Sequence, residues 1–526
     1  MTYLVHDLIL QTANTNPTNE ALRYQQIRLD YKSLASTIRG YANGTAAAGL
    51  CRGERVAVYL PKQMEAVITL FGTSLAGGVF VPINPLLKPE QVSHILNDCN
   101  VRILVTSGDR HAALETTLRT CHDLRTVILT DNPKELSGDT PYKILFWQTV
   151  IDTVSEVILP KPIDMDIAAI LYTSGSTGKP KGVVLSHRNL VSGAQSVSNY
   201  LENRSSDRLL AVLPLSFDYG LSQLTTAFST GASVTLMNYL LPRDVIKTVV
   251  KDKITGLAAV PPLWIQLAQL PWPDEAGETL RYITNSGGHM PATTLTMLRE
   301  SLPKTKVFLM YGLTEAFRST YLPPDQLDER PGSIGKAIPN AEILVVRSDG
   351  TPCVAEEPGE LVHRGSLVAM GYWNDHEKTA ERFKPCPGHP PGLPITELAV
   401  WSGDTVKMDE QGYLYFIGRS DETIKTSGYR VSPTEIEEVI YATGLVSEVA
   451  AVGVPHPTLG QAIVVFAVPH NDQPLAIDSI LDECKRILPA YMVPAQLIAR
   501  QGLPRNPNGK IDRKSLSVEV QDLFRI

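Results

Sequence analysis

Cysteine is scarce in this sequence, and the few cysteines are not grouped. Six are scattered over 526 residues, and no two have CxxC spacing. Disulfide frameworks and cysteine-based zinc sites both need closer grouping. The sequence therefore excludes both, and it is typical of thiols in a reducing compartment.

Positive charge is also in short supply. The net charge is −7, the isoelectric point is about 5.9, and no dense block of lysine and arginine occurs. Proteins that bind nucleic acid gain much of their affinity from such basic surfaces. Nucleic acid is therefore excluded as the main partner.

Long hydrophobic runs are nearly absent. The one candidate, residues 66–87, is uncharged and long enough to span a bilayer, but glycines and prolines interrupt it. We interpret it as a helix, a turn and a buried strand. The N-terminus has neither the basic flank nor the long apolar core of a signal peptide. These patterns predict a cytoplasmic protein without a transmembrane segment.

What the sequence does have is a regular alternation of helical patterns with short apolar runs. The runs are 55–60, 79–83, 101–105, 126–129, 209–213, 233–237, 282–284 and 306–310. Such alternation indicates βαβ units and a parallel or mixed sheet. From about residue 333 to 418, short strands and tight turns predict a β-rich subdomain instead.

A polar, compact boundary follows at about 419–421, and residues 422–526 predict a small α+β domain. Its first helix is expected at 433–443, because Ser432-Pro-Thr-Glu435 has the pattern of a capping box with proline at the first helical position. The predicted fold class is therefore α/β. A large N-terminal domain of mixed sheets with helices, residues 1–418, precedes a small α+β C-terminal domain.

The most distinctive stretch lies between an apolar run at 168–171 and another that starts at Val183. Seven mostly small or hydroxylated residues stand there: Thr173, Ser174, Gly175, Ser176, Thr177, Gly178 and Lys179. Glycines let a backbone approach a ligand closely, and amides, hydroxyls and lysines supply donors and positive charge, so this composition suits phosphate. A flexible surface loop is the alternative, because such clusters are often only that.

The stretch is not a Walker A loop. That pattern requires a glycine five positions before the Gly-Lys pair and a serine or threonine after it. Position 173 is threonine, and Pro180 follows Lys179. An ordinary P-loop nucleotide site is therefore disfavoured.

Polar residues directly follow three of the apolar runs, at 214–220, 284–289 and 311–315. Ligands of open α/β sheets bind at the carboxyl ends of the strands, so these segments are expected to form one site. Asp404 and Lys510 stand in two further turns. The Asp404 carboxylate could accept both hydroxyls of a ribose, although each residue could also be an ordinary turn residue.

In order and spacing, these motifs resemble those of the adenylate-forming superfamily, which comprises AMP-forming acyl-CoA synthetases, nonribosomal-peptide adenylation domains and beetle luciferases. The matching segments cover nearly the whole chain: 172–182, 311–315, 359–361, 402–404, 418–419 and 508–510. More narrowly, the chain resembles the acyl-CoA ligase-like proteins associated with exosortase gene clusters.

The resemblance implies a two-step reaction. A carboxylate attacks the α-phosphorus of ATP with Mg²⁺ to give an acyl-adenylate and pyrophosphate. A thiol of coenzyme A, or of a carrier protein's phosphopantetheine, then displaces AMP. The first step joins two anions, so it needs positive charge and aligned donors more than acid–base chemistry. Any carrier is expected to be a separate protein.

The resemblance also implies roles for single residues. The stretch 173–179 and Lys181 would enclose the β- and γ-phosphates, and Glu315 would hold Mg²⁺, which prefers oxygen ligands. Thr314 would contact the α-phosphate. The adenine would lie against Tyr311, Gly312, Gly288 and His289, and the ribose hydroxyls against Asp404 and Arg419.

Lys510 would bridge the substrate carboxylate and the α-phosphate as a compact point charge, which requires the C-terminal domain to close over the site. Rotation of this mobile domain would then withdraw the lysine and build a tunnel for the pantetheine arm. Asp421 matches the hinge at 419–421. Gly428 matches the loop that lines the tunnel, where a side chain would obstruct the thiol.

Motif alignment also marks an acyl or amino-acid pocket, formed by Asp218, Tyr219, Ser222, Ala259, Thr284, Ser286, Met310, Arg318 and Ser319. Asp218 stands where amino-acid adenylation domains pair an aspartate with the substrate ammonium, and a buried carboxylate needs a cation. Arg318 could be that cation, or both residues could bind an amino acid with a second acidic group. The pocket is too polar for a long alkyl tunnel, so a small polar carboxylic or amino acid is expected.

Three alternatives to an acyl-CoA synthetase stay open at this point. The chain could be a stand-alone amino-acid adenylating enzyme that loads a separate carrier protein, a luciferase-type oxidoreductase, or an inactive nucleotide-binding protein. An inactive copy would often lack the lysine or the magnesium carboxylate, yet Lys510 and Glu315 are both present.

Overall fold

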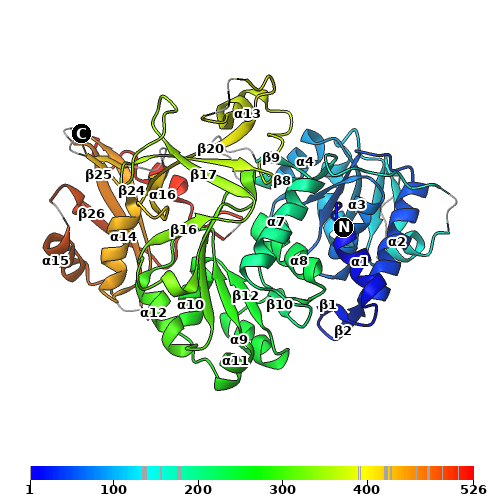
Figure 1. Cartoon of the computed structure of the whole chain (residues 1–526), viewed down its shortest axis with the longest axis horizontal. Helices are drawn as coiled ribbons and strands as arrows, with labels where there is room; N and C mark the ends of the chain where they lie inside the picture. Colours follow the sequence, from blue (N-terminus) through cyan, green and yellow to red (C-terminus); the bar gives the residue numbers. More distant parts are fainter. Residues whose placement is uncertain are drawn as a thin grey trace.

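The fold is seen in a computed structural model of the chain, which describes residues 2–132, 139–154, 157–173, 180–388, 390, 392–419, 424–426, 429–457, 459–470, 474–488, 490–507 and 509–525. Of residues 419, 425, 429 and 430 only the backbone is described. The N-terminal part and the C-terminal domain lie at opposite ends of the long axis of the molecule (Figure 1).

A seven-stranded sheet forms the N-terminal end of the molecule, in the order β7-β6-β5-β3-β4-β8-β9. All neighbours are parallel except β8 and β9, which form an antiparallel hairpin. The strands are β3 (Arg55–Tyr59), β4 (Val79–Pro82), β5 (Val101–Thr106), β6 (Thr126–Leu129), β7 (Lys143–Phe146), β8 (Ile167–Thr173) and β9 (Lys181–Ser186). The apolar runs therefore became strands, as predicted.

A second sheet has fourteen strands, in the order β17-β18-β20-β21-β16-β15-β14-β13-β12-β10-β11-β1-β2, with β19 paired to β20. Its parallel part contains β1 (Glu20–Tyr24), β10 (Arg208–Ala211), β11 (Ser233–Leu236), β12 (Gly256–Ala259), β13 (Tyr282–Asn285) and β14 (Lys306–Tyr311). Pairing turns antiparallel at β15 (Thr320–Leu322) and β16 (Ser333–Ala337), and it stays so to β17.

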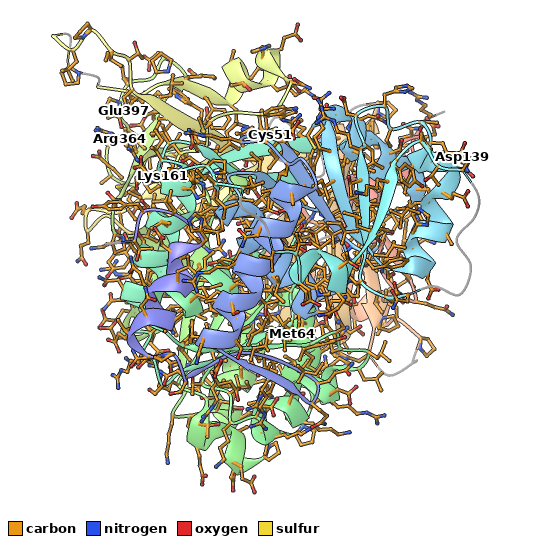
Figure 2. The ribbon with its side chains drawn as sticks, turned by 90° about the vertical axis from the view of Figure 1, so that its right-hand side faces the viewer. Cys51, Met64, Asp139, Lys161, Arg364 and Glu397 are labelled. Atoms are coloured by element: carbon orange, nitrogen blue, oxygen red, sulfur yellow. The ribbon has the colours of Figure 1, made fainter. Side chains whose placement is uncertain are left out.

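The β-rich region is thus joined to the parallel part through β15 and β16 rather than standing apart as a separate sheet. Its further strands are β17 (Ala341–Val346), β18 (Gly359–Gly365), β19 (Phe383–Pro385), β20 (Leu398–Met408) and β21 (Leu414–Arg419); β2 (Ile27–Asp30) closes the other edge. Arg364 of β18 forms a salt bridge with Glu397, just before β20, on the outer surface of this region (Figure 2).

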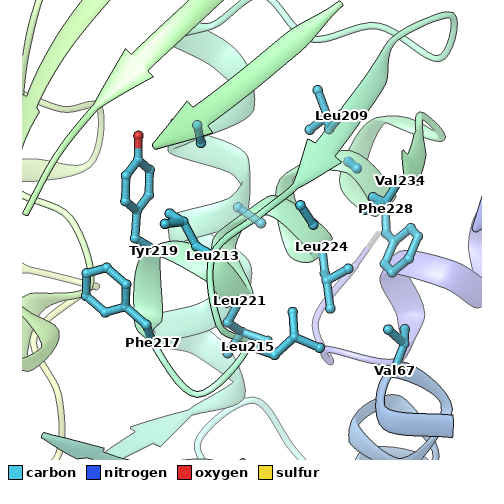
Figure 3. Packing of buried hydrophobic residues seen from close by; sticks show 14 of the residues in the cluster. Val67, Leu209, Leu213, Leu215, Phe217, Tyr219, Leu221, Leu224, Phe228 and Val234 are labelled. Carbon is cyan, nitrogen blue, oxygen red and sulfur yellow. The ribbon is translucent and has the colours of Figure 1, made fainter. Parts of the chain in front are cut away.

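Two adjacent helices, α7 (His187–Tyr200) and α8 (Asp218–Thr230), lie in the main hydrophobic core, which draws buried residues from both sheets. Figure 3 shows Leu221, Leu224 and Phe228 of α8 packed near β10 and β11, with Val67 of α3 beyond them.

The other helices of this part are α1 (Asp7–Thr15), α2 (Tyr31–Ala47), α3 (Met64–Leu75), α4 (Pro89–Asp98), α5 (Gly108–Leu118), α6 (Trp147–Ile151), α9 (Pro242–Lys251), α10 (Pro261–Ala268), α11 (Asp274–Thr279), α12 (Ala292–Ser301) and α13 (His376–Arg382), with short 3₁₀ turns η1 (Thr314–Ala316) and η2 (Pro324–Gln326).

The C-terminal domain has its own sheet and its own core. It contains β22 (Ile424–Thr426), β23 (Tyr429–Val431), β24 (Val446–His456), β25 (Gly460–Pro469), β26 (Gln496–Ala499), α14 (Pro433–Ala442), α15 (Ile477–Ile487), η3 (Ala490–Met492) and α16 (Arg513–Glu519). The predicted helix after Ser432 is confirmed as α14. The predicted capping box is wrong, because the Ser432 side chain makes no capping hydrogen bond, and Pro433 alone marks the helix start.

The interpretation of the long uncharged run is confirmed. The uncharged run 66–87 is the body of α3, a turn and β4. Among the described residues, no helix is both long and apolar enough to cross a membrane. All six cysteines are free thiols, with Cys51 at the surface (Figure 2).

A buried histidine fixes the N-terminal segment to α7. The backbone N–H of Val5 donates to Nδ1 of His187 over 3.1 Å, so this nitrogen must be unprotonated. Burial, reinforced by the nearby His6, lowers the pKa of His187 to about 4, although Asp166 and Asp164 oppose the shift. Protonation would place a charge in the core and remove the acceptor for Val5.

This contact predicts acid sensitivity. Between pH 6.5, the ordinary histidine pKa, and pH 4, the unfolded chain binds a proton at position 187 and the folded chain does not, so stability falls as the pH falls. His187→Asn keeps a side-chain acceptor but cannot titrate. We expect the thermal midpoint of the wild type to drop more between about pH 7.5 and pH 5 than that of the variant, measured by calorimetry. Equal drops would contradict this account.

Candidate active site

The phosphate-loop candidate is the turn of the β8–β9 hairpin. Thr173, the last residue of β8, pairs in register with Lys181, the first residue of β9. The predicted loop residues between them, Ser174, Gly175, Ser176, Thr177, Gly178 and Lys179, lie outside the described residues. The strands on either side of the loop are confirmed, and its phosphate role stays a prediction.

Positive charge gathers beside this hairpin. The ammonium of Lys181 lies 5.2 Å from the centre of the Tyr372 ring. Burial and the charges of Lys378 and Arg382 lower the pKa of Lys181, while Asp375 and Glu315 oppose the shift. Arg382 is held there by donation from Nη1 to the carbonyl of Trp401 over 3.1 Å. Such a cluster suits a polyanion.

Sequence reasoning missed Lys378 and Arg382. Both lie on α13, and their four-residue spacing places them on one side of that helix. That spacing was the available signal, but no motif drew attention to it.

Glu315 lies next to the same cluster. Its Oε1 accepts a hydrogen bond of 2.5 Å from the hydroxyl of Tyr372, and the backbone N–H of Ala369 donates to its carbonyl. Among the described residues no three His, Cys, Asp or Glu side chains form a metal cluster. Mg²⁺ bound with a nucleotide needs only one or two carboxylates besides phosphate oxygens. A single oriented carboxylate therefore fits Mg²⁺ that arrives with ATP.

The residues expected at the nucleoside also come together. Tyr311 ends β14, and its hydroxyl donates to Oδ2 of Asp404 on β20 over 2.5 Å. Asp404 pairs in register with Arg419 of β21, whose side chain is not described. At Gly312, an added Cβ would lie 3.2 Å from the backbone of Arg318, so the turn after Tyr311 is tightly packed.

Lys510 reaches the N-terminal domain. Its turn is closed by donation from its backbone N–H to Oδ1 of Asn506 over 3.0 Å. The ammonium lies 5.6 Å from the centre of the Phe217 ring, and its Cε would stand 3.1 Å from a Cβ placed on Gly287. The lysine therefore enters between the segments that follow β10 and β13.

Two further contacts hold the C-terminal domain in this closed orientation. Nδ2 of Asn84 donates to the carbonyl of Pro507 over 2.6 Å, and Nε2 of His289 pairs with the carboxylate of Glu438 on α14. His289 thus touches the lid, next to Gly288. The predicted hinge residue Asp421 and tunnel residue Gly428 lie outside the described residues.

Asp218 and Arg318 pair with each other, which settles the alternative that the sequence left open. Asp218 begins α8, and its Oδ2 accepts from Nη1 of Arg318 over 3.0 Å. Its Oδ1 accepts from the hydroxyl of Thr314 over 3.3 Å. The side chains of Arg318 and Asp218 are 2% and 4% exposed, so the pair is fully buried and neutral as a unit.

The remaining pocket candidates are mostly engaged within the protein. The hydroxyls of Tyr219 and Thr284 are 2.5 Å apart, and the Arg318 guanidinium lies 4.5 Å from the centre of the Tyr219 ring. Phe217 and Tyr219 stand close together at the start of α8 (Figure 3). Ser222 bonds Thr226, Ser319 bonds His363, and Met310 accepts from Tyr200, while Ala259 and Ser286 are buried at or just after strand ends.

A strained turn delivers Arg318 to Asp218. Phe317 has φ 54° and ψ −43°, a backbone conformation that a bulky residue rarely adopts. Its ring packs on Gly193 of α7, where an added Cβ would lie 2.5 Å from the ring. Such strain persists where surrounding packing enforces it, often at functional sites. Nothing in the residue types predicts this turn.

Some buried polar atoms near these residues lack a partner within the part of the chain that the structure describes. They are Oγ of Ser216, Oδ1 of Asn285, and Nε and Nη2 of Arg318. Buried polar atoms in native proteins are nearly always hydrogen-bonded. Their occurrence after β10, β13 and β14 marks the region where a ligand would supply the missing partners.

Comparison with known proteins agrees with this geometry. Residues 9–373 match the family model described as AMP-binding enzyme, and residues 435–510 match the AMP-binding enzyme C-terminal domain. The chain is 30% identical over 508 residues to the long-chain-fatty-acid–CoA ligase of Salmonella typhimurium, covering 90% of this chain and 86% of that protein. It is 27% identical over 514 residues to bacitracin synthase 3 of Bacillus licheniformis, covering 97% of this chain but only 8% of that protein.

Among solved structures, the anthranilate CoA ligase AuaEII in complex with anthranoyl-AMP superposes with a TM-score of 0.89 at 25% identity, over 100% of this chain and 98% of that one. Both family models match in chain order, and they cover the parallel sheets and the lid. The chain therefore belongs to the AMP-binding enzyme family, the adenylate-forming enzymes that its motifs indicated.

Proposed function

We propose that this protein is an AMP-forming acid–thiol ligase. It activates a carboxylic acid with ATP to an acyl-adenylate, releases pyrophosphate, and transfers the acyl group to a thiol with release of AMP. The observation that carries the proposal is the entry of Lys510 between Phe217 and Gly287, residues that follow β10 and β13 of the large sheet. We place the reaction in the cytoplasm, where its nucleotide and thiol substrates occur.

The first step needs charge neutralisation. A carboxylate and a phosphate repel each other, and a lysine held beside both lowers that barrier without giving up its own proton. Lys181, Lys378 and Arg382 would balance the charge of the departing pyrophosphate at the other end. Thr314 precedes Glu315 in η1, and its hydroxyl would redirect its proton from Asp218 to the α-phosphate when the nucleotide binds.

Glu315 would hold Mg²⁺, and Tyr372 would fix the orientation of its carboxylate. When bound, Mg²⁺ would neutralise part of the phosphate charge. The chain's own part is to present one ordered carboxylate at the edge of the cationic cluster, which the 2.5 Å hydrogen bond from Tyr372 achieves.

The second step needs the lysine removed, because it occupies the approach to the reacting carbonyl. One of the contacts that close the lid, the His289–Glu438 pair, is partly exposed, which makes it weak. We propose that the lid rotates about Asp421 and that Gly428 then lines the path of the thiol. Coenzyme A is the acceptor favoured by the 30% identity to CoA ligases, and a separate carrier protein is the alternative.

The acid is not an α-amino acid in our proposal. Arg318 already neutralises the carboxylate of Asp218, which would otherwise bind a substrate ammonium. A second cation there would face a guanidinium at short range. A small polar carboxylic acid without an amino group fits the pocket better, and loading of a carrier with an amino acid becomes the less favoured alternative.

A panel of acids tests the activity. ATP–pyrophosphate exchange should appear with polar aliphatic or aryl acids and should be absent with α-amino acids, because Asp218 is already neutralised. Positive acids should then form thioesters with coenzyme A without oxygen consumption, which separates the ligase from a luciferase-type oxygenase. Exchange confined to amino acids, or to long-chain fatty acids, would refute the proposed acid class.

The division of labour between the two steps is tested at Lys510. Lys510→Ala should lower pyrophosphate exchange by about 100-fold or more, as expected for the loss of a charge that acts in the transition state. Thioester formation from a supplied acyl-adenylate should change only a few-fold. Lys514→Ala, an exposed lysine in the same domain, is the control. Equal loss of both half-reactions in Lys510→Ala would overturn the assignment.

A further inference from the structure

Arg318 is a buried guanidinium with two of its five N–H donors engaged by described residues. Its Nη1 donates to Oδ2 of Asp218 over 3.0 Å and to the carbonyl of Phe317 over 3.1 Å. Its Nε and Nη2 have no hydrogen-bond partner among the described residues. An arginine carries five N–H donors, so the unpaired edge holds three of them.

The unpaired edge cannot turn away to solvent. Arg318 is 1% exposed, and its guanidinium lies over the Tyr219 ring at 4.5 Å and near the Phe317 ring at 5.8 Å. The strained backbone at Phe317 and the ion pair with Asp218 fix it further. A donor edge held in this way is preorganised for a ligand rather than left over by chance.

Arg318 is one of the residues predicted to form the acyl pocket, and its neighbours belong to the same predicted site. Asp218 links Arg318 to the hydroxyl of Thr314, and the Tyr219 ring beside it bonds Thr284 near the end of β13. Gly287, three residues further along the chain, faces Lys510. The arginine is therefore joined by contacts to Thr314, which is expected at the α-phosphate, and to the strand that precedes the Lys510 contact.

Charge decides which ligand group fits. Asp218 already neutralises Arg318, so a second carboxylate would add an uncompensated buried negative charge beside Asp218. The ammonium of an amino acid would be repelled by the guanidinium of Arg318. A plain alkyl chain would leave the donors unpaired and desolvated, which is also unfavourable. An uncharged oxygen satisfies the donors and keeps the pocket neutral.

We propose that Arg318 recognises an uncharged oxygen acceptor on the acyl group, so that the substrate is a carboxylic acid that also carries a carbonyl, hydroxyl or ether oxygen. One such oxygen can accept from both Nε and Nη2, which lie on one edge of the planar group. This inference rests on the proposed function, because it assumes that the pocket holds the acyl group of an adenylate.

The test uses binding, so that it does not require turnover. Stable 5′-sulfamoyladenosine conjugates replace the acyl-adenylate, with matched four- and six-carbon chains. The set contains conjugates of the plain alkanoates, of the oxo acids with the oxo group at each successive carbon, of the dicarboxylates and of the 2-amino acids. Dissociation constants are measured by calorimetry, and the free acids are assayed for pyrophosphate exchange in parallel.

We expect one oxo conjugate to bind at least about 100-fold more tightly than its plain alkyl counterpart, since a site built to hydrogen-bond a substrate group strongly rejects the analogue that lacks it. In Asp218→Asn/Arg318→Met, which removes both charges together, this ratio should fall below about fivefold. Lys514→Ala, at an exposed position of the C-terminal domain, should keep the ratio. If the double variant does not fold, the order of the dissociation constants that the wild type shows for the conjugates decides whether the inference stands.

Several results would overturn the inference: no preference among the conjugates, tightest binding of the alkyl, dicarboxylate or amino conjugate, or a preference that survives in the folded double variant. Selective binding of an oxo conjugate without pyrophosphate exchange for any acid would instead contradict the proposed function and leave the recognition intact. No binding of any conjugate would overturn both.

Discussion

Two anions have to meet in this site, and the positive charge that allows their meeting comes from a different domain. Lys510 lies on a turn of the C-terminal domain, whereas the residues around it follow β10, β13 and β14 of the large sheet. In the proposed second step the same lysine would be in the way, so we expect this charge to be removable. A C-terminal domain with its own core is suited to move as a unit.

The rest of the site is built on rigid elements. The parallel strands β10 to β14 place Phe217, Thr284 and Tyr311 at one edge, and the continuation of the sheet through β15 and β16 brings Asp404 against Tyr311. Residues 93 positions apart in sequence therefore meet through one continuous ladder of strands. Such a platform would hold the nucleoside end fixed during the proposed rotation of the C-terminal domain.

The sequence predicted the elements well, because strands buried on both faces are short apolar runs whatever their partners are. It predicted the roles of Tyr311, Asp404 and Lys510 only through ordered motifs that resemble a known superfamily, since no local pattern shows that they meet. It named the Asp218–Arg318 pair as one of two alternatives but could not choose between them, because the choice depends on the unusual backbone of Phe317. It missed Tyr372, Lys378 and Arg382, whose importance arises from packing against Glu315 and Lys181. The predicted capping box at Ser432 was wrong, because a residue type that often caps helices does not guarantee the side-chain rotamer that makes the capping hydrogen bond.

The contact between Gly193 and Phe317 has a consequence for how this protein can change over evolutionary time. Any side chain at position 193 would strike the ring, which lies 2.5 Å from where its Cβ would stand, and would disturb the turn that positions Arg318. Substitutions on α7 could thus alter which acid is accepted without touching the acid. Drift at the two positions should be epistatic: a residue larger than glycine at 193 is tolerable only after the aromatic ring at 317 has been lost.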